Sequence, residues 1–486
     1  MKKFLPDLIA ILAFIILSFA YFFPADIEGR ILFQHDTAAG VGAGQESKEY
    51  LERTGERTRW TNSIFGGMPT YQMSPSYDST TSLKGVEKVY RLFLPDYVVL
   101  TFIMMLGFYI LLRAFGISAW LAGLGGVIWA FSSYFFILIP AGHIWKFVTL
   151  AYIPPTIAGV VLAYRKKYLL GGIVTALFIA LQIQSNHIQM SYYFMFVILF
   201  FVGAYFEDAY KKKELPHFFK ASGVLALAAV VGVCINISNL YHTYEYSKET
   251  MRGKSELKQE GAAASQTSSG LDRDYITNWS YGIGETLTLL VPNVKGGGSG
   301  STMSQSEVAM AKANPMYNGI YSQLPQYFGE QPWTAGPVYV GAFVMFLFVL
   351  GCFIVKGPLK WALLGATIFS ILLSWGKNFM GLTDFFIDYM PMYNKFRTVE
   401  MALVIPGMVF PIIAIWGLKE VLSETVSDAL LKRGLIVALA ITGGLSLILW
   451  LMPSMLLDFR SSFDAQYQLP DRKSTRLNSS HVAISY

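Results

Sequence analysis

Residues 147–184 read FVTLAYIPPTIAGVVLAYRKKYLLGGIVTALFIALQIQ, two apolar runs separated by the basic triplet Arg165-Lys166-Lys167. An α-helix needs about 20 mostly apolar residues to cross the hydrocarbon core of a membrane. Lysine and arginine in short loops favour the cytoplasmic side. This stretch therefore predicts two membrane-spanning helices joined by a cytoplasmic turn.

The composition of the whole chain agrees with this interpretation. Of its 486 residues, 53% are hydrophobic and only 14% are charged, whereas a soluble domain carries about 25% charged residues. Such a composition excludes an ordinary cytosolic enzyme and a disordered chain. The net charge is +6, and its basic residues lie in short clusters between apolar runs, which is typical of membrane topology and not of a nucleic-acid-binding surface. We expect contact with membrane lipids and no nucleic acid partner.

Eleven apolar segments predict an all-α polytopic membrane protein, a bundle of about 11 transmembrane helices. The segments are 5–23, 97–115, 119–139, 147–164, 168–184, 190–207, 219–239, 337–355, 359–376, 399–418 and 434–452. If the N-terminus is cytoplasmic, simple alternation places every strong basic cluster inside. It places two long segments outside, residues 24–96 and 240–336. We expect a multi-pass protein of the bacterial inner membrane, in which segment 5–23 is retained as a helix and not cleaved as a signal peptide.

The last sixteen residues, 471–486, are set apart from the fold. Their sequence, DRKSTRLNSSHVAISY, resembles the conceptual translation of a common sequencing adapter. We therefore treat residues 1–470 as one transmembrane domain. We expect that the natural sequence is cut off near Pro470 in this chain. Without this tail, 35 Lys and Arg face 31 Asp and Glu, a net charge of +4.

Polar residues concentrate in the connections predicted to lie outside. Asp36 follows the first span by about a dozen residues, which keeps its carboxylate near the membrane surface. A carboxylate there can act as a general base or contact a divalent cation such as Mg²⁺ or Mn²⁺. The alternative is a solvated acid that caps a helix. Glu46 and Glu49, in the same segment, are candidates for a second acid.

Three further connections carry ionisable or amide groups in apolar surroundings, where such groups are costly and often functional. They are 142–146 with His143 and Lys146, 185–189 with His187 and Gln189, and 394–397 with Lys395 and Arg397. The two cations of 394–397 flank an aromatic residue, which suits the binding of a lipid phosphate. They could equally anchor a helix end by snorkelling, and either histidine could bind a metal or a neighbouring helix.

Several longer motifs resemble bacterial YfhO-like membrane proteins. They are Gln34-His35-Asp36, residues 60–69 (WTNSIFGGMP), residues 186–189 (NHIQ), residues 327–337 (YFGEQPWTAGP) and residues 394–397 (NKFR). The resemblance extends to about residue 460. It implies a GT-C-type glycosyltransferase, which transfers a sugar from a polyprenyl-phosphate carrier to an envelope polymer or lipid acceptor at the outer face of the membrane.

By this resemblance Asp36 is the expected catalytic or metal-contacting group. Lys395 and Arg397 would bind phosphate, while His35, Lys146, His187 and Gln189 would line the cavity. Many GT-C enzymes have two adjacent acids in this loop, whereas Asp36 lies between His35 and Thr37. Family members also continue with further spans, so the chain is expected to lack a C-terminal part and to be inactive if that part is needed.

Two other functions remain open. A transporter or flippase could use the same outer cations to capture an anionic lipid-linked substrate, but it should show repeated broken helices and a polar path through the midplane. A non-catalytic envelope assembly factor would tolerate substitution of Asp36. The polar residues of this chain are concentrated at the outer side, which favours surface chemistry.

Overall fold

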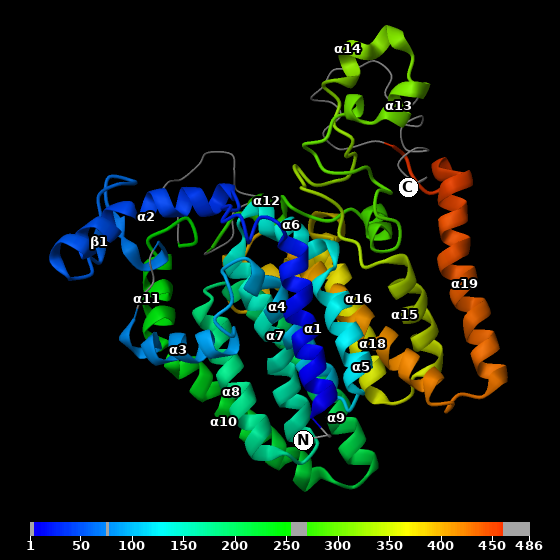
Figure 1. Cartoon of the computed structure of the whole chain (residues 1–486), viewed down its shortest axis with the longest axis horizontal. Coiled ribbons are helices and arrows are strands. Elements are labelled where there is room, and N and C mark those ends of the chain that lie inside the picture. Colours follow the sequence, from blue (N-terminus) through cyan, green and yellow to red (C-terminus); the bar gives the residue numbers. More distant parts are fainter. Residues whose placement is uncertain (1–3, 74–76, 254–269, 460–486) are drawn as a thin grey trace. The chain divides into compact units, whose positions relative to one another are not determined.

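The structure is a computed structural model that describes residues 4–73, 77–253 and 270–459, and these residues are mostly helical, with little sheet (Figure 1). The chain divides into two units. Unit 1 comprises Met1–Phe131 with Leu138–Lys254, and unit 2 comprises Ser132–Ile137 with Ser255–Tyr486. The predicted adapter-derived tail, 471–486, lies outside the described residues.

An apolar helix occupies each of the eleven predicted segments, which confirms the all-α, membrane-type fold class. Among the described residues, six helices are long and apolar enough to cross a membrane, and up to eight spans result if each of two bent helix pairs forms one. Three of the remaining segments form shorter apolar helices. The six long helices are Leu5–Phe22, Ile144–Tyr164, Ile188–Lys211, Leu215–Ile235, Val399–Leu422 and Asp428–Leu451.

Unit 1 is a bundle built around α7 (Ile144–Tyr164). Its other apolar helices are α1 (Leu5–Phe22), α4 (Val98–Ala114), α5 (Ala119–Ala130), the end of α6 (Ser133–Ala141), α8 (Tyr168–Gln184), α9 (Ile188–Lys211) and α10 (Leu215–Ile235). Helix α7 contacts α4, α8, α9 and α10. Glycines allow this close packing, because a Cβ on Gly171 of α8 would lie 2.5 Å from the Ala163 nitrogen of α7. Small residues serve this purpose where helices pack in membranes.

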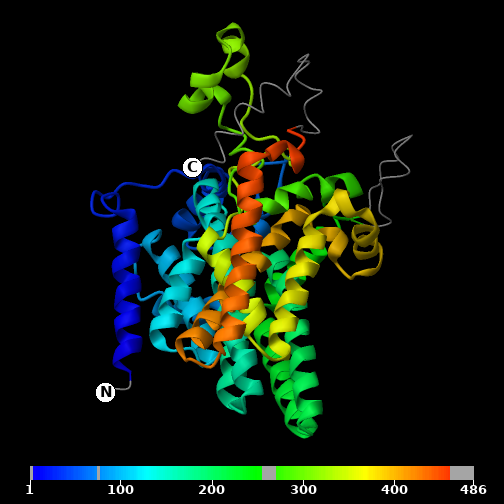
Figure 2. The same cartoon turned by 90° about the vertical axis from the view of Figure 1, so that its right-hand side faces the viewer.

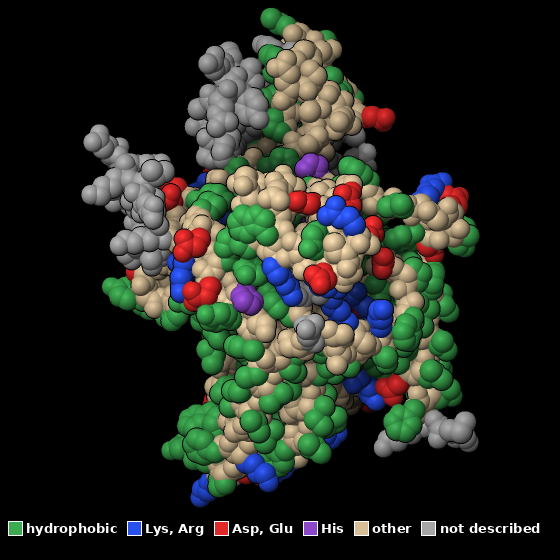
Figure 3. Space-filling model, turned by 90° about the vertical axis from the view of Figure 1, so that its left-hand side faces the viewer, with side chains coloured by type: hydrophobic (Ala, Val, Ile, Leu, Met, Phe, Trp, Pro, Cys, Tyr) green, Lys and Arg blue, Asp and Glu red, His purple; other side chains and the backbone are tan. Residues whose placement is uncertain are grey.

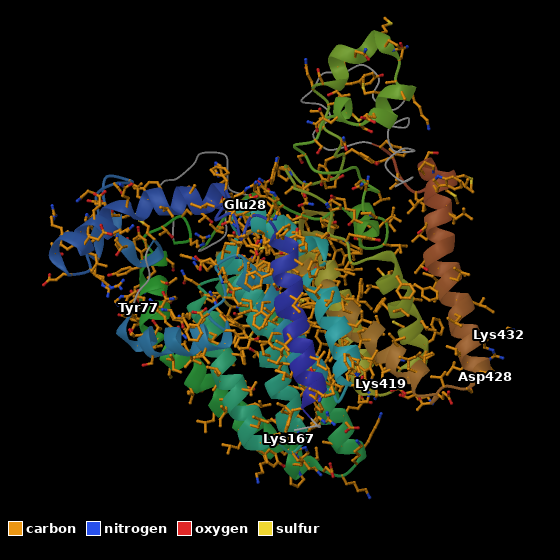
Figure 4. The ribbon with its side chains drawn as sticks, viewed as in Figure 1. Glu28, Tyr77, Lys167, Lys419, Asp428 and Lys432 are labelled. Carbon is orange, nitrogen blue, oxygen red and sulfur yellow. The ribbon has the colours of Figure 1, made fainter. Side chains whose placement is uncertain are left out.

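The basic clusters of unit 1 gather at the end where α1 begins, which we call its near end. Arg113 pairs with Asp7 at 2.8 Å, and Lys166 pairs with Glu214 at 2.9 Å. In Figure 4, Lys167 lies at this end and Glu28 lies at the opposite, far end, beyond the C-terminus of α1. Residues predicted to share one side of the membrane therefore share one end of the unit.

The first long segment of unit 1 is folded. It contains α2 (His35–Thr54), the antiparallel pair β1 (Trp60–Thr61) and β2 (Met68–Pro69), the short helices η1 (Thr70–Gln72) and η2 (Asp78–Thr80), and α3 (Thr81–Tyr90). The β1–β2 region meets α11 (Ile237–Ser247) through an aromatic stack, in which the His242 ring lies 4.8 Å from that of Tyr71 and 5.8 Å from that of Tyr77.

Unit 2 contains the remaining helices. They are α12 (Arg273–Thr277), α13 (Glu307–Lys312), α14 (Asn318–Tyr321), α15 (Ala342–Ile354), α16 (Pro358–Ser374), α17 (Met380–Tyr389), α18 (Val404–Leu422) and α19 (Asp428–Leu451). Helix α15 packs against α18 and α19 (Figure 2). A Cβ on Gly417 of α18 would lie 2.8 Å from the Gly351 Cα of α15. At the contact between α15 and α19, a Cβ on Gly434 of α19 would lie 2.9 Å from the Leu350 side chain, and Figure 4 labels Asp428 and Lys432 near the start of α19.

The predicted span 359–376 ends in a sharp bend. Helix α16 and the Gly376–Tyr389 segment meet at 111°. Gly376 has a φ of +43°, and a Cβ there would lie 2.1 Å from the Ser280 hydroxyl oxygen. The bend therefore requires glycine, both for its backbone conformation and for the space beside Ser280.

Candidate functional site

Asp36 lies in the first turn of α2, at the far end of unit 1. Its Oδ2 is 3.1 Å from Nε2 of His143, the residue that precedes α7. Its Oδ1 lies 3.4 Å from Nδ1 of His35. The Asp36 side chain remains 55% exposed. The carboxylate is thus positioned by an imidazole and still accessible to a substrate.

The start of α2 is held against the turn between α6 and α7. The Gln34 amide donates a hydrogen bond to the Ile139 carbonyl at 2.6 Å, and the Thr37 hydroxyl donates to the Gln34 side chain at 2.9 Å. Gly142 has a φ of +82°, and a Cβ there would lie 2.9 Å from the Thr37 nitrogen. Only glycine permits this approach, which brings His143 to Asp36.

Lys146, His187 and Gln189 also lie at the far end of unit 1. Lys146, in the first turn of α7, is only 5% exposed, and Gln189, in the first turn of α9, is 9% exposed. Gln189 donates to the Tyr193 hydroxyl at 3.1 Å. Burial, followed by the positive charge of Lys146 and a smaller effect of His143, lowers the pKa of His187 to about 3. His187 is therefore neutral at pH 7, and its Nδ1 has no hydrogen-bond partner among the described residues.

Glu46 and Glu49 are not brought to Asp36. They lie ten and thirteen residues further along α2, which is about 15 and 20 Å at 1.5 Å per residue. The Glu46 carboxylate instead accepts hydrogen bonds from the backbone nitrogens of Asn62 at 2.8 Å and Ser63 at 3.0 Å, and from the Thr61 hydroxyl. These bonds lower the pKa of Glu46. Glu46 therefore fixes the β1 turn to α2 and does not act as a second acid beside Asp36.

Lys395 and Arg397 belong to unit 2 and form a separate set. Lys395 ends a short 3-10 helix (Tyr393–Lys395), and partial burial lowers its pKa. Arg397 donates to the Tyr275 hydroxyl, and its guanidinium carbon lies 5.2 Å from the centre of the Tyr275 ring. The two cations of residues 394–397 thus lie close together in sequence, and the Arg397 guanidinium is held on the face of the Tyr275 ring.

Two arrangements were missed by the sequence reasoning. In unit 1, Glu87 and Arg91 pair near the end of α3, and the Tyr152 hydroxyl of α7 donates to Glu87 at 2.9 Å. An i, i+4 acid–base pair on an amphipathic segment could have indicated the first. In unit 2, the buried Glu285 carboxylate accepts from the backbone nitrogens of Gly282 at 2.8 Å and Glu330 at 3.1 Å.

The 327–337 motif owes its shape to Glu285. The Tyr327 hydroxyl donates to that carboxylate at 2.5 Å, and a Cβ on Gly329 would lie 2.3 Å from its oxygen. The motif therefore folds around a buried acid, and a lone Glu in the sequence gave no signal of this.

The donor set around Asp36 does not fit a metal held by the protein alone. Mg²⁺ and Mn²⁺ prefer several oxygen ligands, whereas the carboxylate has two imidazoles as neighbours. Among residues 4–73, 77–253 and 270–459, no group of three or more His, Cys, Asp or Glu side chains could hold a metal ion. The reaction proposed for Asp36 uses no metal.

No protein-family model, no curated protein and no solved structure matches the chain.

Proposed function

We propose that the protein is a membrane glycosyltransferase that transfers a sugar from a polyprenyl-phosphate carrier to an envelope acceptor at the outer face of the inner membrane. The observation that carries the proposal is the Asp36–His143 pair, with its 3.1 Å contact and half-exposed carboxylate, at the end of unit 1 that also holds the buried Lys146 and the neutral His187. A general base that is fixed by an imidazole suits the activation of a hydroxyl group.

In the proposed reaction, the acceptor hydroxyl oxygen attacks the anomeric carbon of the donor sugar and forms the new glycosidic bond. Its proton passes to the Asp36 carboxylate. The bond between the anomeric carbon and the phosphate oxygen breaks, and the polyprenyl phosphate departs with the electron pair. Lys146 supplies a cation in the same unit for the charge that develops on the phosphate.

We assign Lys395 and Arg397 a phosphate-binding role that is tested separately, because the proposal for Asp36 does not depend on them. An arginine fork matches phosphate oxygens bidentately. Substituting both by Gln should weaken the binding of polyprenyl phosphate itself, measured as a raised dissociation constant for that lipid. An unchanged dissociation constant would leave them as anchors of the helix end.

The direct test compares Asp36→Asn with Glu52→Gln in the full-length natural protein. Glu52 lies on the same helix, is 65% exposed and contacts Lys48 only at 3.8 Å, so it is a matched control. Loss of a general base should lower sugar transfer by roughly 10²- to 10⁴-fold, whereas the control should retain it. The assay is transfer of radiolabelled sugar from its polyprenyl phosphate to an acceptor membrane fraction, in nanodiscs.

Transfer by Asp36→Asn at the parent rate would rule out this role for Asp36. Equal thermal melting of parent and variant checks that folding is intact. Asp36→Glu, which keeps a carboxylate, should recover part of the activity that Asp36→Asn loses.

A further inference from the structure

Helix α3 (Thr81–Tyr90) presents three chemically different faces. At 100° per residue, Leu83, Glu87 and Tyr90 lie on one face, which contacts the bundle; Leu83 is 7% exposed. Val86 and Val89 lie on a second face and are 43% and 61% exposed. Two exposed lysines, Lys84 and Lys88, lie one turn apart on the side away from the valines.

The contacts of α3 place it below the far end of unit 1 and not above it. The Tyr90 ring lies 5.1 Å from that of Phe178, which precedes the end of α8 by six residues. Glu87 is bound by Tyr152, which lies eight residues into α7. At 1.5 Å per residue, these contacts lie about 9 and 12 Å inside the bundle. Helix α7 is one of the candidate spans, so α3 is level with the outer part of the apolar zone.

The residues that follow α3 extend its apolar face. Leu92 and Phe93 adopt left-handed backbone conformations, with φ of +50° and +55°, which residues with a Cβ rarely adopt. Their side chains are nevertheless 45% and 75% exposed. The chain thus adopts an unfavourable backbone conformation directly after α3, and two more large apolar groups remain exposed there.

The surface around α3 changes character along the bundle. Figure 3 views the side of unit 1 that carries α2 and α3. Hydrophobic side chains cover much of the lower half, apart from basic groups at its lower edge, and charged side chains concentrate in the upper half. Lys84 and Lys88 add positive charge next to an apolar face at this level, which complements the phosphates of an anionic lipid leaflet.

We propose that α3 is an in-plane membrane helix that binds an anionic phospholipid leaflet. Val86, Val89, Leu92 and Phe93 lie among the acyl chains, and Lys84 and Lys88 contact the lipid phosphates. Amphipathic helices of this kind lie with their apolar face about 5–10 Å into the boundary between headgroups and acyl chains, which is the depth that the contacts with α7 and α8 give. This lipid contact is independent of the reaction proposed for Asp36.

The first test measures the depth of two positions with spin labels. Cys234 and Cys352 are both free, so Cys234→Ser and Cys352→Ser provide the background for Val89→Cys, Lys88→Cys and the control Glu52→Cys on α2. The full chain is placed in nanodiscs of phosphatidylglycerol and phosphatidylcholine. Oxygen, which concentrates in acyl chains, should relax the label at 89, whereas a water-soluble nickel chelate should relax the labels at 88 and 52.

Two outcomes would overturn the proposal. Equal access of the nickel chelate to labels 89 and 52 would place α3 in water. Exclusion of both reagents from label 89 would mean that protein, and not lipid, covers this face.

The second test addresses the lysines. A bimane at position 89 is quenched by phosphatidylglycerol or phosphatidylcholine that carries a headgroup nitroxide. Parent protein should prefer the anionic lipid, and Lys84→Gln and Lys88→Gln should each reduce that preference by up to about fivefold. Lys48→Gln on α2, whose side chain is 75% exposed, should not reduce it. A preference that is absent in the parent, or unchanged by both substitutions, would overturn the headgroup contact.

Discussion

His187 makes the stability of the far end of unit 1 sensitive to pH. Its pKa is lowered to about 3 by burial and then by the charge of Lys146, whereas in the unfolded chain it is about 6.5. Between these values the unfolded chain binds one more proton than the folded protein. This contribution to stability is therefore complete above pH 6.5 and is lost progressively as the pH falls toward 3.

We expect His187→Gln to reduce the loss of stability on acidification. A fully buried, neutral histidine would lower the free energy of unfolding by about 1.4 kcal/mol for each pH unit below 6.5. Because the His187 side chain keeps partial exposure, we expect a loss of about 1 kcal/mol or less per pH unit. The measurement is the unfolding free energy in mild detergent between pH 7.5 and 4.5. His35→Gln, at a side chain that is 86% exposed, is the control, and equal slopes for all three proteins would contradict the prediction.

At individual residues, the sequence identified polar groups in apolar surroundings but not the partners that they contact. Asp36, His143 and His187 were chosen because they are polar in apolar surroundings. Their proximity depends on the turn at Gly142 and on helix packing between positions more than a hundred residues apart, which no local pattern encodes. The contacts of Glu46 were not predictable, because its partners include backbone nitrogens of the β1 turn, which any residue type can supply.

The interface between α7 and α8 depends on glycine. A Cβ on Gly171 would lie 2.5 Å from the Ala163 nitrogen and 2.7 Å from the Gly159 carbonyl oxygen. Both atoms belong to the backbone, so neither can rotate away. We expect Gly171→Ala to lower the free energy of unfolding by about 1–3 kcal/mol through overpacking, measured as a lower Tm in detergent.

Gly203→Ala on α9 is the matched control, because nothing lies within 4 Å of its Cβ position. It should be neutral or should stabilise by up to about 1 kcal/mol. A Gly171→Ala protein that melts at or above the temperature of the parent would show that α7 and α8 are not held as closely as described.

Among the elements, the long apolar helices were predictable from the sequence, whereas the bend at Gly376 and the short helix α3 were not. Hydrophobic length located the long apolar helices among the described residues, because burial in lipid or protein selects for it. The bend at Gly376 went unrecognised, since one glycine at the end of an apolar run has no distinctive pattern. Helix α3 lies within segment 24–96, which is predicted to be outside the membrane, and its ten residues are too few for a span.

For the whole molecule, the alternation of basic clusters predicts a definite topology. Cysteines placed singly at Glu28, Lys167 and Lys432, in the background without Cys234 and Cys352, can be labelled in intact bacterial cells with a membrane-impermeant maleimide. We expect labelling at position 28 and protection at 167 and 432 until the cells are permeabilised.

Each deviation from this pattern has a definite meaning. Reversal at all three positions would invert the orientation and place Asp36 on the cytoplasmic side. Labelling at 432 with protection at 167 would break the alternation for unit 2 alone. The fold class followed from hydrophobic length, and the pattern of sides stays a prediction from charge. The division into two units was not predictable, because it depends on contacts between distant segments.

Helix α2 has no buried residue, yet it is attached at two points, through Asp36 to His143 and through Glu46 to the β1 turn. The number of residues between these two points must therefore be kept, because it sets the angle between Asp36 and Glu46 around the helix, whereas the residue types between them can vary. A one-residue insertion between them would rotate Glu46 by about 100° relative to Asp36 and separate it from Asn62. An insertion of seven residues would nearly restore the angle while lengthening the helix by about 10 Å. Natural variation here should consist of substitutions and not of changes in length.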